Sequence, residues 1–353
     1  MKTMIVMVML IMTICFCFTL CEGSNDVIPW NVIIIGWDGA GRDNIKNYLQ
    51  QGLLPNMNAL SAQGTIVAID NLRTTDTKSG WAQILTGYEP EVTGVFSNHR
   101  YGPIPKGLTI FERLKQFFGP GFVTVAIIGK KNHVDADPSS YQEILEQDFK
   151  WIKRKIKKYK SEPINVENPP SEFKTEFITQ DGKYFKKIPA KPFYITRQNM
   201  NEFINGLLKD KVVGTTALEY IDLYQRLPFM FFIHFAEIDH QGHKFGEGSR
   251  QQVKAYVSAD YWTGKIIDKL KELDLYDHTL IYVTSDHGFD VGRQSHKDAP
   301  YVFLATNDTN VLRRGYRVDI TATILHRLGI DIQTINPPLD GKPLTIPFEQ
   351  VKW

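Results

Sequence analysis

The stretch Asn31-Val32-Ile33-Ile34-Ile35-Gly36-Trp37-Asp38-Gly39 decides the fold. Its unbroken β-branched run, ended by glycine, is typical of a strand that is buried on both faces. Similar apolar runs occur at 123–128, 229–235 and 279–284, and helical periodicity occurs between them at 43–51, 110–118, 200–227 and 249–273. This alternation predicts an α/β fold with a mostly parallel sheet covered by helices on both faces.

Composition and charge narrow the possible classes of protein. The chain has 353 residues, of which 42% are hydrophobic and 23% charged, and its formal net charge is +2. Such a composition excludes a mainly disordered, collagen-like or coiled-coil chain. The small net charge gives no overall field for nucleic acid, so we expect no specific nucleic-acid recognition. The length suits two domains, or one large α/β domain with an insertion.

The N-terminus has the pattern of a secretory signal peptide. Lys2 precedes an apolar stretch at 4–20, and the small residue Gly23 offers a cleavage point, so we expect a signal peptide at 1–23 and a mature folded domain at 24–353. The protein would then be exported to the periplasm or the extracellular space. The alternatives are an uncleaved membrane anchor and a lipoprotein modified at Cys21, although Leu20 suits the latter poorly. The chain's three cysteines, Cys15, Cys17 and Cys21, all lie in this segment.

The middle of the chain carries a basic segment. Residues 139–160 predict one long amphipathic helix with a lysine-rich end from Lys150 to Lys160, and 161–198 is proline-rich and irregular. We interpret 139–198 as an insertion or cap over the sheet. The simplest interpretation of the lysines is a solvated face that suits a helix C-terminus. The alternative is a contact with an anionic surface, namely a membrane, a polyanion or the substrate.

Carboxylates and histidines gather directly after the predicted strands, where parallel sheets collect their chemistry. Unpaired carboxylates at such an edge would repel one another, and a divalent cation removes that conflict. Mixed imidazole and carboxylate ligands favour zinc, with manganese or iron as weaker options. There are enough donors for two metals, the arrangement used for in-line phosphoryl displacement. The donors are Asp38, Asp239, His243, Asp286, His287 and His296, whereas we expect His234 and His240 to be packing or surface residues.

A hydroxyl-rich loop could supply a nucleophile. The segment Thr74-Thr75-Asp76-Thr77-Lys78-Ser79-Gly80-Trp81 precedes a helix, and a helix N-terminus suits an anionic substrate. A threonine hydroxyl becomes an effective nucleophile when a divalent cation lowers its pKa. The alternative for these residues is ordinary N-capping of the helix.

Together these motifs resemble the alkaline phosphatase superfamily, and most closely its type I phosphodiesterase/nucleotide pyrophosphatase branch. The resemblance runs from about residue 30 to the C-terminus and leaves 139–198 unmatched. It implies an alkaline phosphatase-like three-layer α/β/α sandwich with an inserted cap. It also implies Thr77 as the catalytic nucleophile and metal-bridging group, Asn98 as a donor to a phosphate oxygen, and two zinc sites, one of Asp38, Asp286 and His287 and the other of Asp239, His243 and His296.

One residue departs from the family pattern. Lys78 follows Thr77 where related phosphodiesterases usually have an aromatic residue, so Lys78 either meets an anionic group of the substrate or points to solvent. The sulfatase branch is unlike this chain, because Ser79-Gly80-Trp81-Ala82-Gln83 lacks the required proline or alanine and the arginine, and no cysteine lies beyond residue 21.

The resemblance implies a secreted two-zinc metallohydrolase that cleaves phosphodiester or pyrophosphate bonds of a small-molecule phosphate ester through a covalent phospho-threonine. Two alternatives remain open. The first is a phosphomonoesterase, phosphonate or sulfate ester hydrolase of the same superfamily. The second is a non-catalytic, zinc-stabilised protein that binds a polyanion through Lys150 to Lys160.

Overall fold

The computed structural model describes residues 31–71, 73–160 and 176–347. Its main body is built on an eight-stranded sheet in the order β11-β2-β10-β9-β1-β8-β3-β7. Only β10 runs antiparallel to its neighbours, so the predicted mostly parallel sheet is confirmed. The strands are β1 (Asn31–Trp37), β2 (Thr65–Asp70), β3 (Val123–Ile128), β7 (Glu202–Asn205), β8 (Phe229–Phe235), β9 (Thr279–Thr284), β10 (Tyr301–Thr306) and β11 (Gly315–Tyr316).

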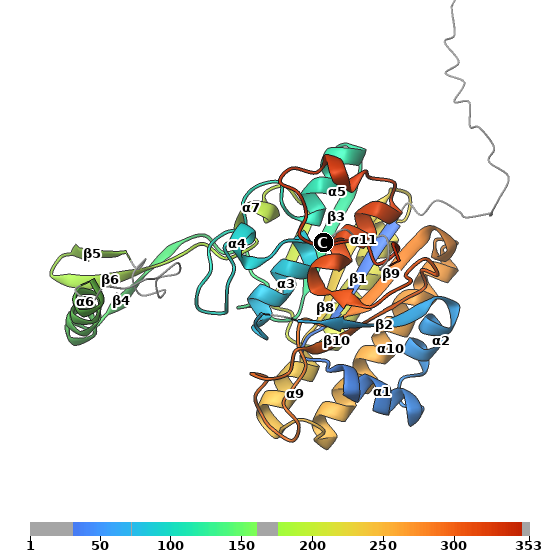
Figure 1. The fold of residues 1–353 in the computed structure, drawn as a ribbon, viewed down its shortest axis with the longest axis horizontal. Coiled ribbons are helices and arrows are strands. Elements are labelled where there is room, and N and C mark those ends of the chain that lie inside the picture. The colour runs from blue at the N-terminus through green and yellow to red at the C-terminus, as the bar shows by residue number, and fades with distance from the viewer. Residues whose placement is uncertain (1–30, 72, 161–175, 348–353) are drawn as a thin grey trace, which may run out of the picture.

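Helices cover both faces of this sheet and complete the predicted three layers (Figure 1). Alternate residues of β1 enter two separate cores, Val32 and Ile34 on one face and Ile33 and Ile35 on the other. The first core also contains residues of α3 (Thr77–Thr86), α5 (Ile110–Phe118) and α11 (Arg317–Arg327). The second contains residues of α1 (Arg42–Gln50), α2 (Pro55–Gln63), α8 (Asp210–Tyr224), α9 (Glu237–Phe245) and α10 (Arg250–Glu272). Both faces of β1 are fully buried, as its apolar sequence requires.

The helix expected at 200–227 is wrong in its first part. Residues Glu202–Asn205 form the edge strand β7, which pairs in parallel with β3, and α8 begins only at Asp210. An edge strand has one neighbour and one exposed side, so its short sequence lacks the continuous apolar run of the central strands. Two further short helices, α4 (Pro90–Thr93) and α7 (Tyr194–Arg197), lie in the connections.

The helix expected at 139–160 is also wrong in its first part. Ser140–Ile144 forms strand β4, which pairs antiparallel with β6 (Lys183–Ile188), and β5 (Phe177–Gln180) completes a separate three-stranded sheet. Only Glu146–Lys160 is helical, as α6. Its Phe149 ring stacks on Tyr184 at 4.2 Å between centroids, which holds α6 against this small sheet. The spacing of Ser140 and Glu143 therefore belongs to a strand, although it matches that of a capping box.

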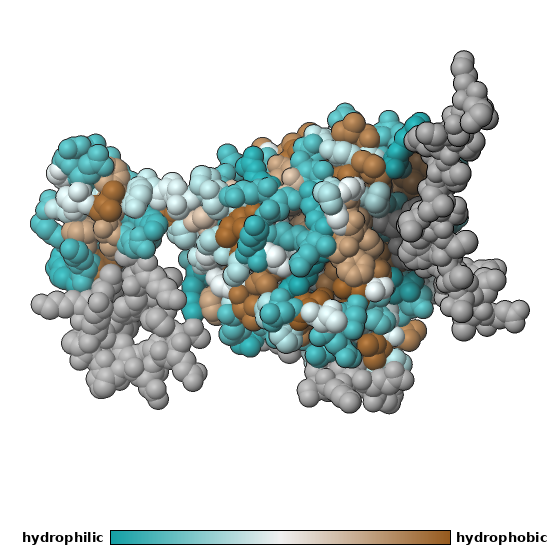
Figure 2. Space-filling view, turned by 90° about the horizontal axis from the view of Figure 1, so that it is seen from above, coloured by the Kyte–Doolittle hydropathy of each residue, from teal (hydrophilic) through white to brown (hydrophobic). Residues whose placement is uncertain are grey.

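The small sheet and α6 form an arm that projects from the main body and does not lie over the large sheet as a cap (Figure 1). Seen from above, the arm is a separate lobe with a mostly hydrophilic surface and a small apolar patch (Figure 2). Lys150, Lys153 and Arg154 lie on its helix, whereas the side chains of 155–160 are outside the description. A contact between the lysine-rich segment and an anionic surface stays a prediction.

In the described part of the chain, no helix combines the length and the apolarity that a membrane crossing requires. The expected signal peptide at 1–23 lies outside the described residues.

Candidate active site

Three central strands bring the predicted ligands together. In the register of the sheet, Gly36 of β1 pairs with His234 of β8 and with Thr284 of β9. The three strands therefore end at the same level, and the residues that follow them share one edge of the sheet. The predicted ligands on this edge form two groups whose donor atoms lie within 4.8 Å of one another.

The first group consists of Asp38, Asp286 and His287, all fully buried. Burial and repulsion by Asp38 raise the pKa of Asp286 well above its ordinary value. The Asp286 Oδ2 atom has no hydrogen-bond partner although it is buried. A buried carboxylate oxygen without a partner is unfavourable, and a bound cation would remove this cost. The donor atoms of this group are also those that a cation site uses.

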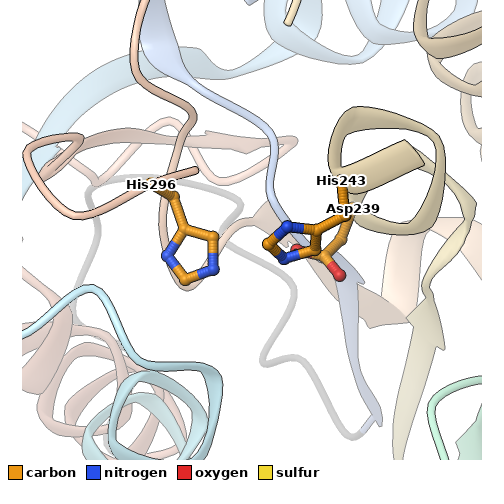
Figure 3. A group of neighbouring side chains, drawn as sticks. All are labelled: Asp239, His243 and His296. Carbon is orange, nitrogen blue, oxygen red and sulfur yellow. The ribbon is translucent and has the colours of Figure 1, made fainter. Parts of the chain in front are cut away.

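The second group consists of Asp239, His243 and His296. Asp239 and His243 lie one turn apart on α9, and His296 comes from the loop after β9 and faces them (Figure 3). Here too a buried atom, Asp239 Oδ1, lacks a hydrogen-bond partner. Burial and the neighbouring His287 lower the pKa of His296 to about 4, so its ring is neutral at neutral pH, the form that binds a metal. The rings of His287 and His296 stack at 3.8 Å between centroids, which joins the two groups.

Backbone carbonyls orient two of the histidines. His287 Nδ1 donates to Gly288 O at 2.9 Å, and His243 Nδ1 donates to Gln294 O at 2.9 Å. Because Nδ1 carries the proton in each neutral ring, Nε2 keeps its lone pair and faces the carboxylates. A hydrogen bond of this kind is the usual way in which proteins orient a metal-binding imidazole. The predicted ligands therefore lie together, and two of the three histidines are held with Nε2 toward the carboxylates.

Thr77 lies beside both groups at the N-terminus of α3. Its Oγ1 atom is 3.2 Å from His287 Nε2, and the side chain is 1% exposed. No side chain caps α3, so the N-capping alternative for the hydroxyl-rich loop does not hold. The close approach of α3 to β1 depends on Gly36, where a Cβ atom would lie 2.4 Å from the Trp81 ring. The missing side chain of Gly36 thus allows Thr77 to reach Asp38 and its neighbours.

Lys130 is a site residue that sequence reasoning missed. It follows β3, next to β8 in the sheet, and its Nζ lies 2.7 Å from Asp239 Oδ2, 3.3 Å from Asp38 Oδ1 and 3.3 Å from Thr77 Oγ1. Burial alone would raise the pKa of Asp38 and Asp239, but the Lys130 ammonium holds both below their usual range. Its position two residues after a buried strand is a signal in the sequence for such a role, although lysine is not a usual metal ligand.

Two further buried residues support the site. His234, expected to be a packing or surface residue, contacts Asp38 Oδ2 through Nε2 at 3.0 Å. Arg317 of α11 donates to Asp286 O at 2.6 Å and to Thr74 O at 3.0 Å, and so ties the loop before Thr77 to the end of β9. Neither residue belongs to a motif, because each acts through contacts that only the fold creates.

The predicted substrate-binding residues lie next to Thr77. Asn98 Oδ1 accepts a hydrogen bond from Lys78 N at 3.0 Å. Because this contact uses the amide oxygen, the Asn98 NH2 group is left to act as a donor. The Lys78 side chain is 4% exposed, so it does not point to solvent. Burial and the nearby Lys191 lower the pKa of Lys78 to about 8.

Comparison with known sequences identifies relatives of the chain. A family model described as "Type I phosphodiesterase / nucleotide pyrophosphatase" matches residues 32–335. "Ectonucleotide pyrophosphatase/phosphodiesterase family member 1" of Rattus norvegicus is 25% identical over 270 residues, which cover 75% of this chain and 24% of the rat protein. "Bis(5'-adenosyl)-triphosphatase ENPP4" of Homo sapiens is 21% identical over 269 residues, which cover 75% of this chain and 49% of the human protein. The chain thus spans a quarter to a half of the length of these relatives.

Comparison with solved structures supports the same fold. The lipoteichoic acid synthase LtaP of Listeria monocytogenes superimposes with a TM-score of 0.55 at 13% identity, over 91% of this chain and 76% of that one. An alkaline phosphatase superfamily protein of Vibrio parahaemolyticus gives a TM-score of 0.53 at 17% identity, over 91% and 71% of the two chains. The chain therefore belongs to the type I phosphodiesterase/nucleotide pyrophosphatase family and has the fold of the alkaline phosphatase superfamily.

Proposed function

We propose that this protein is an exported, metal-dependent hydrolase that cleaves phosphodiester or pyrophosphate bonds of a small-molecule phosphate ester, with Thr77 as its nucleophile. The observation that carries the proposal is the position of Thr77 Oγ1, which contacts both His287 Nε2 and Lys130 Nζ between two groups of metal-binding side chains. The names of the relatives, ectonucleotide pyrophosphatase/phosphodiesterase and bis(5'-adenosyl)-triphosphatase, support this class of substrate and a location outside the cell.

Two zinc ions fit the donors, with manganese or iron as weaker options. One would be held by Asp38, Asp286 and His287, with Thr77 as a further ligand, and the other by Asp239, His243 and His296. The buried, unpartnered oxygens Asp239 Oδ1 and Asp286 Oδ2 and the oriented Nε2 atoms of His243 and His287 support this assignment. When bound, such ions withdraw charge from phosphoryl oxygens and lower the pKa of a hydroxyl or water.

The side chains of the protein then perform four tasks. The Thr77 oxygen attacks phosphorus in line, the leaving group departs on the opposite side, and water later resolves the covalent phospho-threonine. The Lys130 ammonium lies 3.3 Å from that oxygen and favours its anionic form. The amide of Asn98, held through its oxygen by Lys78 N, donates to a non-bridging oxygen that gains charge in the transition state. Burial of Asp38 and Asp286 excludes water from the metal ligands, which strengthens these interactions.

A comparison of the wild type with Thr77→Ala tests this proposal. Both proteins are loaded with zinc, their metal content is measured, and hydrolysis of bis-p-nitrophenyl phosphate is followed. We expect Thr77→Ala to keep its metal and lose turnover by several orders of magnitude, because it lacks the attacking oxygen. Thr77→Ser keeps a hydroxyl and should retain part of the activity. Wild-type turnover by the alanine variant would contradict the assignment.

A further inference from the structure

Two lysines, one of them directly after the nucleophile in the chain, contact one aromatic ring. The Nζ atom of Lys78 lies 4.8 Å from the centroid of the Tyr101 ring, and that of Lys191 lies 5.5 Å from the same centroid. Lys191 also donates to the Tyr101 hydroxyl at 3.2 Å. The two ammonium groups are therefore held on a common aromatic support and do not extend freely into solvent.

Lys78 is tied to the active site, and Lys191 is tied to the base of the arm. Lys78 directly follows Thr77, and its Nζ donates to Asn132 O at 2.8 Å. Asn132 lies two residues after Lys130, whose ammonium contacts Thr77 Oγ1. Lys191 comes from the chain that returns from the arm, and its backbone N donates to Asp137 O at 2.9 Å. The base of the arm thus adds the positive charge of Lys191 to the wall that Lys78 and Tyr101 form.

The charges of this wall are not balanced. Lys78 is 4% exposed, yet within the described ranges no carboxylate lies within ion-pair distance of its Nζ. Lys191 has one carboxylate near it, Asp135, at 3.9 Å. An ammonium group has three donors, and Lys78 uses one of them on Asn132. A buried ammonium is stable only when an anion or hydrogen bonds compensate for lost water, so an anionic ligand would complete this wall.

We propose that Lys78 and Lys191 form an anion subsite, and that the natural substrate carries a second anionic group next to the phosphate that is cleaved. This inference rests on the proposed function, because it assumes that Thr77 attacks a bound phosphate ester. The proposed subsite gives a chemical reason for the lysine at position 78. With a cation directly after Thr77, the site would select its substrates by charge.

Three matched chromogenic esters test the subsite. These are p-nitrophenyl propyl phosphate, p-nitrophenyl carboxyethyl phosphate and p-nitrophenyl phosphonooxyethyl phosphate, which share the leaving group and differ in the second substituent. We expect kcat/KM of the zinc-loaded wild type to be roughly tenfold or more higher for a charged ester than for the propyl ester, as for one charge-assisted hydrogen bond. The two charged esters distinguish a carboxylate from a phosphate.

Substitutions at the two lysines show whether these residues cause the preference for charged esters. Lys191→Met and Lys78→Met should each reduce the ratio of charged to propyl ester toward one, and a general loss of activity cancels in that ratio. Lys191→Arg keeps a positive charge and should retain much of the preference for charged esters. The exposed Lys46→Met on α1 is the control and should leave the ratio unchanged. Lys191 is partly exposed, so its variant stays informative if Lys78→Met fails to fold.

Binding separates failure of the subsite from failure of the proposed function. Zinc-loaded Thr77→Ala is titrated with the propyl and charged esters by calorimetry. A wild type that hydrolyses none of the esters would refute the proposed function, whereas the ratio of the dissociation constants would still report the subsite. Equal affinity and equal kcat/KM for propyl and charged esters would overturn the inference, as would a Lys191→Met variant that keeps the full preference.

Discussion

Replacement of Lys130 by methionine should strongly destabilise the metal-free protein. Its ammonium lies 2.7 Å from Asp239 and 3.3 Å from Asp38, both fully buried. With an effective dielectric constant of 20, these distances give attractions of about 6 and about 5 kcal/mol. The cost of burying the ammonium, several kcal/mol, offsets part of this. Removal of one partner from a buried pair typically costs about 3–5 kcal/mol, which we expect for Lys130→Met.

Urea unfolding with a metal chelator, at pH 7, measures this loss, with Lys46→Met as the control. Zinc should recover part of the loss, because bound cations supply the missing positive charge. The loss should also depend on pH. The pKa of Asp38 and Asp239 is depressed in the folded protein, so their pairing stabilises the fold above the ordinary value of 3.8 and is lost as the pH falls below it. A chelated Lys130→Met protein as stable as the wild type at pH 7 would refute the reasoning.

Three further substitutions test buried residues of the main body. Burial and Glu237 raise the pKa of Asp210 from 3.8 to about 8. The free energy of unfolding of the wild type should therefore fall as the pH rises from about 4 to about 8, by up to about 1.4 kcal/mol per pH unit. In urea titrations, Asp210→Asn should remove this slope. Gly80→Ala places a Cβ atom 2.7 Å from Asp286 Cβ, so it should lower the free energy of unfolding by about 1–3 kcal/mol and reduce the metal content. The control Gly121→Ala has open space around its Cβ atom and should change neither quantity. Arg317→Met leaves the backbone oxygens of Asp286 and Thr74 without their donor and should lower the thermal midpoint by several degrees, more than the same substitution at an exposed arginine does.

The predictions that succeeded rest on buried, repetitive features. The strands β1, β3, β8 and β9 are apolar runs buried on both faces, and their sequence alone fixes their limits closely. Because parallel strands end on one edge, the positions of Asp38, Asp239 and Asp286 followed from the pattern, and the structure brings all six predicted ligands into two groups.

The predictions that failed rest on local patterns that tertiary contacts override. The sequence of 140–144 has helix-like spacing, yet pairing of Glu143 with Phe185 makes it a strand. The residues of the edge strand β7 also fit a helical pattern, but their pairing with β3 makes them a strand. Lys130, His234 and Arg317 act through partners distant in the chain, so their contacts cannot be predicted from the residues near them in the sequence.

The most direct test of the central claim is mass spectrometry of the acid-quenched enzyme. Zinc-loaded wild type is mixed with bis-p-nitrophenyl phosphate, quenched within the turnover time and digested. The account predicts a peptide that carries the p-nitrophenyl phosphoryl group on Thr77, and no such peptide from Thr77→Ala. Turnover of this ester with the adduct on another residue, or with no adduct and an active Thr77→Ala, would contradict it.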